Sequence, residues 1–507
     1  MSVSLPQTDL ILGVVGAGAM GRGIAQVAAT GGMTVLLFDS RPEAAAEARQ
    51  YVEKMLARAV EKTILSAPDA QAAIGRIRPI ANLAELAACH LVIEAVVENL
   101  KVKQEMFAEL EDIVSDDCII ASNTSSLSIT TIAARARRPQ RIAGFHFFNP
   151  VPLMRLVEVI DGLLTLPAVG DALMDVGRRM GREPVRVKDA PGFLVNQVGR
   201  AYTLEAAHLV SEGIASFADV DAVMRDMVGF RMGPFELLDL VGLDVNHPAT
   251  EAIYRQFYEE PRYRPSVLMQ GHLDAGLLGS KSKRGFYVYD GAKAAPVAEA
   301  PAPTECPYPV WVSRAEAETA ARLLALLDEL GVTVEGGERP SANALCLVTP
   351  VGEDATQCAV AQGLDARRTV AVDMLFNTQK RRCVMSTPLT DPAYRDAARA
   401  VLGKDGMPVT ALRDSPGFIA QRIVAMIVNI GASIAQQRTA SPDDINKAVK
   451  LGLGYPHGPL GFGDTLGPKT IQKILGSMQQ RYGDPRYRPG LWLVRRAELG
   501  APLTLQD

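Results

Sequence analysis

An internal repeat is the feature that most constrains the fold of this chain. The segment DAPGF at 189–193 recurs as DSPGF at 414–418, GPFELLDLVG at 233–242 recurs as GPLGFGDTLG at 458–467, and PRYRP at 261–265 recurs at 485–489. The offsets in sequence number are 225, 225 and 224. Three motifs that recur in register predict a duplicated domain. Strand-like runs stop near residue 186, so we expect both copies to be helical.

Between the two copies lies a segment rich in alanine and proline, GAKAAPVAEAPAPTECP at 291–307, which is typical of an extended linker. The stretch that follows is too short for a full nucleotide-binding domain and has no GxGxxG, but runs such as TVAVDMLF at 369–376 indicate strands. The predicted domains are a Rossmann-like domain at 1–187, a helical domain at 188–290, a linker at 291–308, a degenerate α/β segment at 309–405 and a repeated helical domain at 406–507.

The N-terminal part of the chain, at 1–187, alternates between strands and helices. Apolar runs predict strands at 10–15, 33–39, 90–97, 118–122, 141–148 and 156–160, with helical stretches between most of them. This order predicts a doubly wound, mostly parallel sheet. The expected fold class is therefore an α/β Rossmann-type N-terminal domain plus an all-α domain, followed by a shortened α/β segment and a repeated all-α domain.

Composition excludes several classes of protein. The 507 residues carry a net charge of −4, which argues against a general nucleic-acid binder. Six scattered cysteines include no CxxC pair, so we expect neither a zinc site nor a dithiol centre. No uninterrupted apolar stretch is long enough for a transmembrane helix, and the N-terminus has no signal-peptide pattern. We expect a cytoplasmic protein with no membrane or nucleic-acid partner and no metal.

A glycine-rich turn follows the first predicted strand and opens a helix. Gly16, Gly18 and Gly21 form GxGxxG, in which the glycines permit a tight turn, a close approach to a pyrophosphate and close packing of helix on strand. Asp39 ends the second strand, where a carboxylate would accept the ribose hydroxyls and repel a 2′-phosphate. Arg41 lies nearby and could hold such a phosphate, but Asp39 favours NAD.

Two ionisable residues lie inside apolar strands. His146 ends one strand, and Glu158 lies in LVEVI twelve residues later. On adjacent strands they could pair, so that the carboxylate orients the imidazole and stabilises its protonated form, as a general base requires. A buried structural histidine is an equally good interpretation of the spacing alone.

Other polar residues allow more than one interpretation. Ser125 follows a predicted strand and could bind a reacting oxygen, or only form a turn. Asn196 lies early in a helix and could be a second contact or a capping residue. Lys54, Arg58 and Lys62 recur every four residues, which is usual for a solvated helix face but also suits a phosphorylated ligand.

Together these residues resemble the L-3-hydroxyacyl-CoA dehydrogenase family over nearly all of residues 8–290. The linker and the second half resemble its long 3-hydroxybutyryl-CoA dehydrogenase form, which is associated with phenylacetate degradation. The motifs that carry the resemblance are GAGAMG at 16–21, EAVVENLKVK at 94–103, SNTSSL at 122–127, HFFNPVPLMRLVEVI at 146–160, DAPGFLVNQ at 189–197 and GPFELLDLVGLD at 233–244.

The resemblance implies a role for each candidate residue. It makes His146 the catalytic base and Glu158 its partner, and it assigns Ser125 and Asn196 to the substrate oxygen. It implies that Glu98, Lys103 and Asn149 lie by the nicotinamide half of NAD. It also implies cationic residues for the phosphates of the acyl-CoA substrate, for which Arg58 and Lys62 are our choices. The implied reaction is the NAD-dependent oxidation of an (S)-3-hydroxyacyl-CoA.

The second copy departs from this pattern. Gln421 stands where the first copy has Asn196, and Ala371, or Asp373 after a small shift, stands opposite His146. We therefore expect one active site. The helical domain forms the dimer interface in short family members, so the duplicated copy suggests an internal pseudo-dimer or a homodimer, or else only a packing appendage. Competing functions are a related dehydrogenase of a free hydroxy or sugar acid and a non-catalytic NAD-binding scaffold.

Overall fold

The computed structural model describes residues 5, 6, 8–291, 293–299, 301 and 303–507. The predicted linker includes positions 292, 300 and 302, which lie outside the described residues. Contacts divide the chain into two units. The first comprises Met1–Gln197 with Gln437–Leu453, and the second comprises Val198–Gln436 with Gly454–Asp507. A piece of the second copy thus packs with the N-terminal part of the chain.

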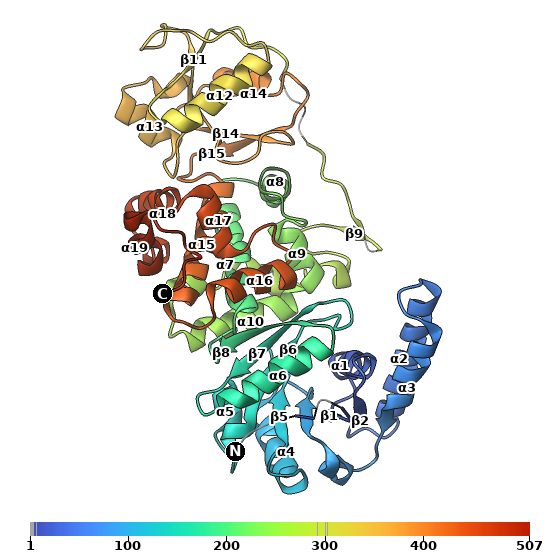
Figure 1. The fold of residues 1–507 in the computed structure, drawn as a ribbon. Helices are drawn as coiled ribbons and strands as arrows, with labels where there is room; N and C mark the ends of the chain where they lie inside the picture. Colours follow the sequence, from blue (N-terminus) through green and yellow to red (C-terminus); the bar gives the residue numbers. More distant parts are fainter. Residues whose placement is uncertain (1–4, 7, 292, 300, 302) are drawn as a thin grey trace. The chain divides into compact units, whose positions relative to one another are not determined.

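The first unit is built on an eight-stranded sheet of order β3-β2-β1-β4-β5-β6-β7-β8, in which only the β6–β7 pair is antiparallel (Figure 1). This confirms the Rossmann-type fold predicted from the alternating apolar runs. The strands are β1 Ile11–Val15, β2 Thr34–Phe38, β3 Ile77–Pro79, β4 Leu91–Glu94, β5 Ile119–Ser122, β6 Ile142–Phe147, β7 Leu156–Asp161 and β8 Glu183–Lys188.

Helices connect these strands and cover the sheet. They are α1 Ala19–Thr30, α2 Ala44–Glu61, α3 Ala67–Arg76, α4 Leu100–Ile113, α5 Ile129–Ala133 and α6 Pro167–Arg179. Strands β4 and β5 are buried along their whole length, as expected for central strands of a sheet with both faces covered. Parallel strands end at one edge of a sheet, so the loops after β1, β4 and β5 share that edge.

Two sets of helices confirm the predicted duplication. The first copy contains α7 Val195–Ser211, α8 Phe217–Val223, α9 Pro234–Val241, α10 Leu243–Gln256 and α11 Val267–Asp274. The second contains α15 Ala420–Gln436, α16 Pro442–Gly452, α17 Pro459–Leu466, α18 Pro468–Tyr482 and α19 Leu491–Leu499. Each copy opens with the same turn, in which Phe193 and Phe418 adopt positive φ angles of 50° and 48°. Within the described residues, no helix is long and apolar enough to span a membrane.

The second unit contains a five-stranded sheet of order β11-β12-β13-β14-β15, in which only β13–β14 is antiparallel. The position of that antiparallel pair matches these strands to β4–β8. The predicted α/β segment therefore retains the half of the sheet that corresponds to the catalytic motifs, and among the described residues it has no counterpart of β1–β3. The strands are β11 Val310–Val312, β12 Leu345–Val348, β13 Thr369–Val372, β14 Arg382–Ser386 and β15 Val409–Arg413.

The two copies exchange short segments, residues 437–453 of the second copy and the residues around Ile214 of the first, which we call arms. In the first unit, the Lys188 amide at the end of β8 donates to the Thr439 carbonyl at 2.8 Å. In the second unit, the Arg413 amide at the end of β15 donates to the Ile214 carbonyl at 3.1 Å. Both partners of one bond lie 225 positions from those of the other. Each sheet is therefore hydrogen-bonded at its last strand to an arm from the opposite helical copy.

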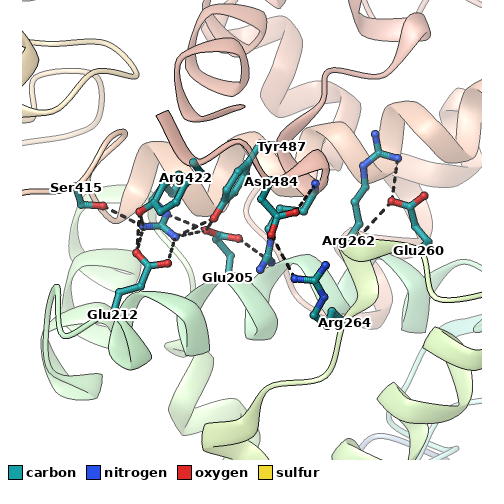
Figure 2. A network of polar contacts seen from close by, with 11 residues as sticks. Glu205, Glu212, Glu260, Arg262, Arg264, Ser415, Arg422, Asp484 and Tyr487 are labelled. Carbon is teal, nitrogen blue, oxygen red and sulfur yellow. Dashed lines mark hydrogen bonds and ion pairs between the residues drawn. The ribbon is translucent and has the colours of Figure 1, made fainter. Parts of the chain in front are cut away.

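The two PRYRP turns meet in the second unit (Figure 2). Arg264 pairs with Asp484 at 3.3 Å, and Arg488 pairs with Glu260 at 2.6 Å. Glu260 and Arg264 lie 224 positions before Asp484 and Arg488, so the two ion pairs are equivalent. A contact that occurs twice with its partners exchanged is the mark of a twofold axis. The two helical copies are therefore related by a pseudo-twofold axis at this point.

A buried charge cluster breaks this symmetry (Figure 2). The Arg422 guanidinium lies 2.7 Å from the Glu205 carboxylate, and both side chains are inaccessible to solvent. Arg486 reaches the other Glu205 oxygen at 2.9 Å, and Arg422 also pairs with Glu212 at 3.0 Å. Burial opposes ionisation of Glu205, but Arg486 and Arg422 outweigh it and lower its pKa to about 2.

Candidate active site

The glycine turn after β1 has the geometry that phosphate binding needs. Gly16 has a φ of 102°, and a Cβ there would lie 2.5 Å from the Ala95 carbonyl oxygen. A Cβ on Gly21 would lie 1.7 Å from the Gly16 carbonyl oxygen. Around Gly18, at the start of α1, no described atom lies within 4 Å of a built Cβ. The turn therefore leaves room at the helix N-terminus, where a pyrophosphate binds.

Asp39 lies beside this turn, after β2. Its carboxylate accepts hydrogen bonds from the Ala17 amide at 2.8 Å and the Arg41 amide at 2.9 Å, which fix its orientation. A cavity of about 520 Å³ continues from Asp39, lined by residues 38–43, 45, 46 and 79–81. The residues present therefore fit the adenosine half of a dinucleotide, with Asp39 placed for a ribose.

His146 and Glu158 face each other across β6 and β7. They are directly paired in the antiparallel register, and His146 Nδ1 lies 2.7 Å from Glu158 Oε2. Glu158 is inaccessible to solvent, and its Oε1 accepts hydrogen bonds from the amides of Leu194 at 3.2 Å and Val195 at 2.9 Å. A carboxylate at Nδ1 favours the tautomer with its proton there, which leaves Nε2 able to accept a proton.

Ser125 and Asn196 lie within hydrogen-bond reach of each other. The Asn196 side-chain amide donates to the Ser125 carbonyl at 3.3 Å, and the Ser125 side chain is exposed. The neighbouring Asn123 accepts from the Phe147 amide at 2.9 Å, which ties this loop to the end of β6. Asn149 is exposed just beyond that strand. The loop after β5, the end of β6 and the start of α7 therefore form one connected site.

Glu98 organises the Ser125 loop. One of its oxygens accepts hydrogen bonds from the Thr124 hydroxyl at 2.5 Å, the Ser126 hydroxyl at 2.8 Å and the Ser125 amide at 3.3 Å. Burial opposes ionisation of Glu98, but the Thr124 hydrogen bond and the Lys103 charge outweigh it, so its pKa lies below the ordinary value. The anionic carboxylate is thus stabilised where it orders the loop.

The family resemblance predicted Lys103 at this site, but sequence reasoning missed Glu94 and Ser122, which lie behind the loop. Lys103 is almost wholly buried, and its ammonium lies 2.6 Å from Glu94 and 3.3 Å from Glu98. The second Glu94 oxygen accepts from the Ser122 hydroxyl at 2.7 Å. Glu94, a charged residue at the end of the apolar strand β4, could have indicated this site, because a buried charge needs a partner. Lys103 therefore holds two carboxylates of the site.

Lys54, Arg58 and Lys62 form an exposed stripe at the C-terminal part of α2. The structure brings them together as the four-residue spacing predicts. They lie in a different part of the first unit from the His146–Glu158 pair, on the helix that follows β2.

The second sheet has different chemistry at the equivalent positions. Its β14–β15 register keeps the sequence offset of 225, which puts Cys383 at the place of Glu158. The Asp373 amide donates to the Cys383 carbonyl at 3.0 Å, so Asp373, and not Ala371, stands opposite it. Gln421, the counterpart of Asn196, donates to the Asp373 carboxylate at 3.0 Å. An imidazole base is therefore replaced by a fully buried carboxyl.

Replacing Asp373 by asparagine should stabilise the protein at neutral pH. Burial raises the pKa of Asp373 from 3.8 to about 6, although the Gln421 hydrogen bond opposes this. Because the folded pKa is raised, the favourable contribution of the protonated form is present below pH 4 and is lost as the pH rises through 6. We expect Asp373→Asn to gain up to about 3 kcal/mol at pH 8 and little at pH 4. Urea unfolding at both pH values checks this, and an equal effect at both would contradict it.

Family models match most of the chain. The model for the NAD-binding domain of 3-hydroxyacyl-CoA dehydrogenase matches residues 11–190. The model for the C-terminal domain of 3-hydroxyacyl-CoA dehydrogenase matches twice, at residues 192–289 and 417–503. The second match falls on the repeated helical copy.

Several 3-hydroxyacyl-CoA dehydrogenases are similar to this chain. The 3-hydroxyadipyl-CoA dehydrogenase of Escherichia coli K12 is 37% identical over 96% of this chain and 97% of its own. A probable 3-hydroxybutyryl-CoA dehydrogenase of Bacillus subtilis is 43% identical over 55% of this chain and 96% of its own. The crystal structure of 3-hydroxybutyryl-CoA dehydrogenase from E. coli K12 matches with a TM-score of 0.85 and 35% identity, over 97% of this chain and 99% of the other. The chain therefore belongs to the 3-hydroxyacyl-CoA dehydrogenase family, and it is an oxidoreductase with an NAD-binding domain at residues 11–190.

Proposed function

We propose that this protein oxidises short (S)-3-hydroxyacyl-CoA thioesters, including dicarboxylic ones, to 3-oxoacyl-CoA with His146 as the general base. The observation that carries the proposal is the buried His146–Glu158 pair in a sheet that also has the dinucleotide turn. Bound NAD would accept the hydride that leaves C3 of the substrate. The hydroxyl proton would pass to His146 Nε2, and loss of the hydride and the proton together would leave a carbonyl at C3.

Glu158 would keep the proton of the resting imidazole on Nδ1 and stabilise the imidazolium once Nε2 is protonated. Ser125 and Asn196 would hold the substrate oxygen, and the Glu98 hydrogen bonds would fix the loop that presents Ser125. Asn149 lies just beyond His146 and is proposed to contact the nicotinamide half of NAD. Lys103 is nearly inaccessible, so we propose that it acts on the cofactor site through Glu98.

The phosphates of CoA need a cationic surface, and Arg58 and Lys62 are our proposed partners for them. Arg58 lies in the last turn of α2 and Lys62 directly follows the helix, and both side chains are exposed. Binding a phosphate there would not require a buried charge to be desolvated. A cluster of like charges at such a surface attracts a multiply charged anion even when the net charge of the chain is −4.

The substrate class can be tested directly with purified protein. Reduction of NAD should be seen with (S)-3-hydroxybutyryl-CoA and (S)-3-hydroxyadipyl-CoA. It should be far slower with the (R) isomer or with free 3-hydroxybutyrate, and reduction of NADP in place of NAD should be far slower as well. The relatives named above motivate the two thioesters. A preference for the free acid would favour a dehydrogenase of hydroxy or sugar acids. Binding of NAD without turnover of any thioester from C4 to C16 would favour a scaffold.

We also propose that the two helical copies act as an internal pseudo-dimer. The equivalent ion pairs Arg264–Asp484 and Arg488–Glu260 support this, because each copy makes the same contact with the other. The Arg422–Glu205 pair occurs once, since the corresponding positions of the opposite copies hold Gln197 and Ile430. Two identical copies would make every such pair twice, once on each side of the axis, so a pair that occurs once belongs to two copies whose sequences have diverged.

Two further sequence-based assignments stay proposals. We propose the four domains 1–187, 188–290, 309–405 and 406–507, with the linker at 291–308 between the second and the third, although residues 437–453 pack with the first of them. We propose a cytoplasmic location because all six cysteines in the structure are unpaired, and disulfides are rare in a reducing compartment.

A further inference from the structure

The second copy contributes residues to the catalytic unit. Its arm, residues 437–453, packs with Met1–Gln197, and α16 within it contacts both β7 and β8. Besides the Lys188–Thr439 bond, the Asp444 carboxylate accepts from the Arg186 amide at 3.4 Å. The Lys447 ammonium donates to the Pro184 carbonyl at 3.4 Å. The arm is therefore attached along β8, the strand next to the one that carries Glu158.

The end of the arm reaches the support of Glu158 itself. A Cβ on Gly452, the last residue of α16, would lie 2.8 Å from Leu156 Cδ2 and 3.2 Å from Val195 Cγ2. Leu156 precedes Glu158 by two positions on β7, so both side chains lie on one face of the sheet. Val195 donates its amide to Glu158. Gly452 thus touches both elements between which the Glu158 carboxylate is held.

We propose that Gly452 is a positioning residue, through which the degenerate second half sets the geometry of the His146–Glu158 pair. The glycine lets α16 approach closely enough to hold β7 and the start of α7 at the separation that Glu158 spans. A larger residue must push Leu156 or Val195 away, and interiors packed at crystal density transmit such a displacement. The inference rests on the catalytic role proposed for His146 and Glu158.

The test is the variant Gly452→Val in the full-length protein. We expect kcat for (S)-3-hydroxybutyryl-CoA to fall at least tenfold, while KM for NAD changes less than twofold, because the glycine turn after β1 is untouched. The fall of kcat at acid pH should also move to lower pH, since a displaced Glu158 carboxylate stabilises the protonated imidazole less. A change that only reduced the folded fraction would scale kcat without moving the pH profile.

A matched control and a compensating change sharpen the test. Gly476→Val alters a glycine of α18 around which no described atom lies within 4 Å of a built Cβ, so activity should stay unchanged. Leu156→Ala added to Gly452→Val removes the nearest clashing atom and should recover at least half of the lost activity. If Gly452→Val does not fold, Gly452→Ala makes the same test with one added carbon.

The outcomes separate this inference from the proposed function. Wild-type kcat and pH profile in Gly452→Val, with His146→Ala inactive, would overturn the inference alone. Full activity in His146→Ala would overturn the proposed function. A loss in Gly452→Val that Leu156→Ala does not relieve, with an unmoved pH profile, would also count against the positioning role.

Discussion

His146→Ala is expected to lower kcat by about 10²–10⁴-fold, the range that a positioned general base contributes. The alanine variant has no group to take the hydroxyl proton as hydride leaves C3. NADH binding should stay within about twofold of wild type, because Gly16, Gly18 and Asp39 lie on other elements of the sheet. Steady-state NADH formation gives kcat, and NADH fluorescence gives the binding control.

Glu158→Gln extends this test at nearly constant shape. The glutamine oxygen can still accept from the Leu194 and Val195 amides, but its NH₂ group then faces His146 Nδ1. The imidazole would turn its acceptor toward that NH₂ and carry its proton on Nε2, which is the wrong tautomer for a base. We expect a loss comparable with that of His146→Ala. More than half of wild-type kcat in both variants would refute the assignment.

Glu205→Gln should produce the largest loss of stability. It leaves Arg486 buried without the carboxylate that compensates it and leaves Arg422 with Glu212 alone, and breaking a buried pair of this kind costs about 3–5 kcal/mol. Glu260→Gln is the matched control, since the Glu260–Arg488 pair is partly exposed and should contribute only about 0–1 kcal/mol. Urea unfolding followed by the helical circular dichroism signal measures both.

The stability difference between wild type and Glu205→Gln should also depend on pH, in a direction that can be predicted. The pKa of Glu205 is lowered from 4.5 to about 2, so its contribution to stability is present above pH 4.5 and is lost as the pH falls toward 2. The difference in unfolding free energy between wild type and Glu205→Gln should therefore be constant from pH 8 to 5 and shrink below. A difference that grows on acidification would contradict an ionised, paired Glu205.

The parts that sequence could predict are those that depend on local pattern. The glycine turn follows from spacing, and each of Gly16 and Gly21 proves to be a position where a Cβ would collide with backbone. His146 and Glu158 could be expected to meet because both are polar residues in neighbouring apolar strands. Spacing alone left a structural histidine equally good, and the family resemblance decided between the two.

What sequence could not predict depends on distant parts of the chain. Arg422 and Glu205 are 217 positions apart, and nothing local to either indicates the other. The family resemblance named Lys103, but nothing local to it indicates that it is buried against Glu94 and Glu98. The choice between Ala371 and Asp373 needed the strand register, because β13 is displaced by two residues from the offset that β14 and β15 keep.

The exchange of arms has a consequence for how the chain can be divided. Cleavage in the alanine- and proline-rich linker would give two fragments, divided at the predicted boundary between the first helical domain and the second α/β segment. The C-terminal fragment would carry the arm that bonds to Lys188, and the N-terminal fragment would carry the segment around Ile214 that bonds to Arg413. Such fragments would remain associated after cleavage, and neither would be a complete protein when expressed alone.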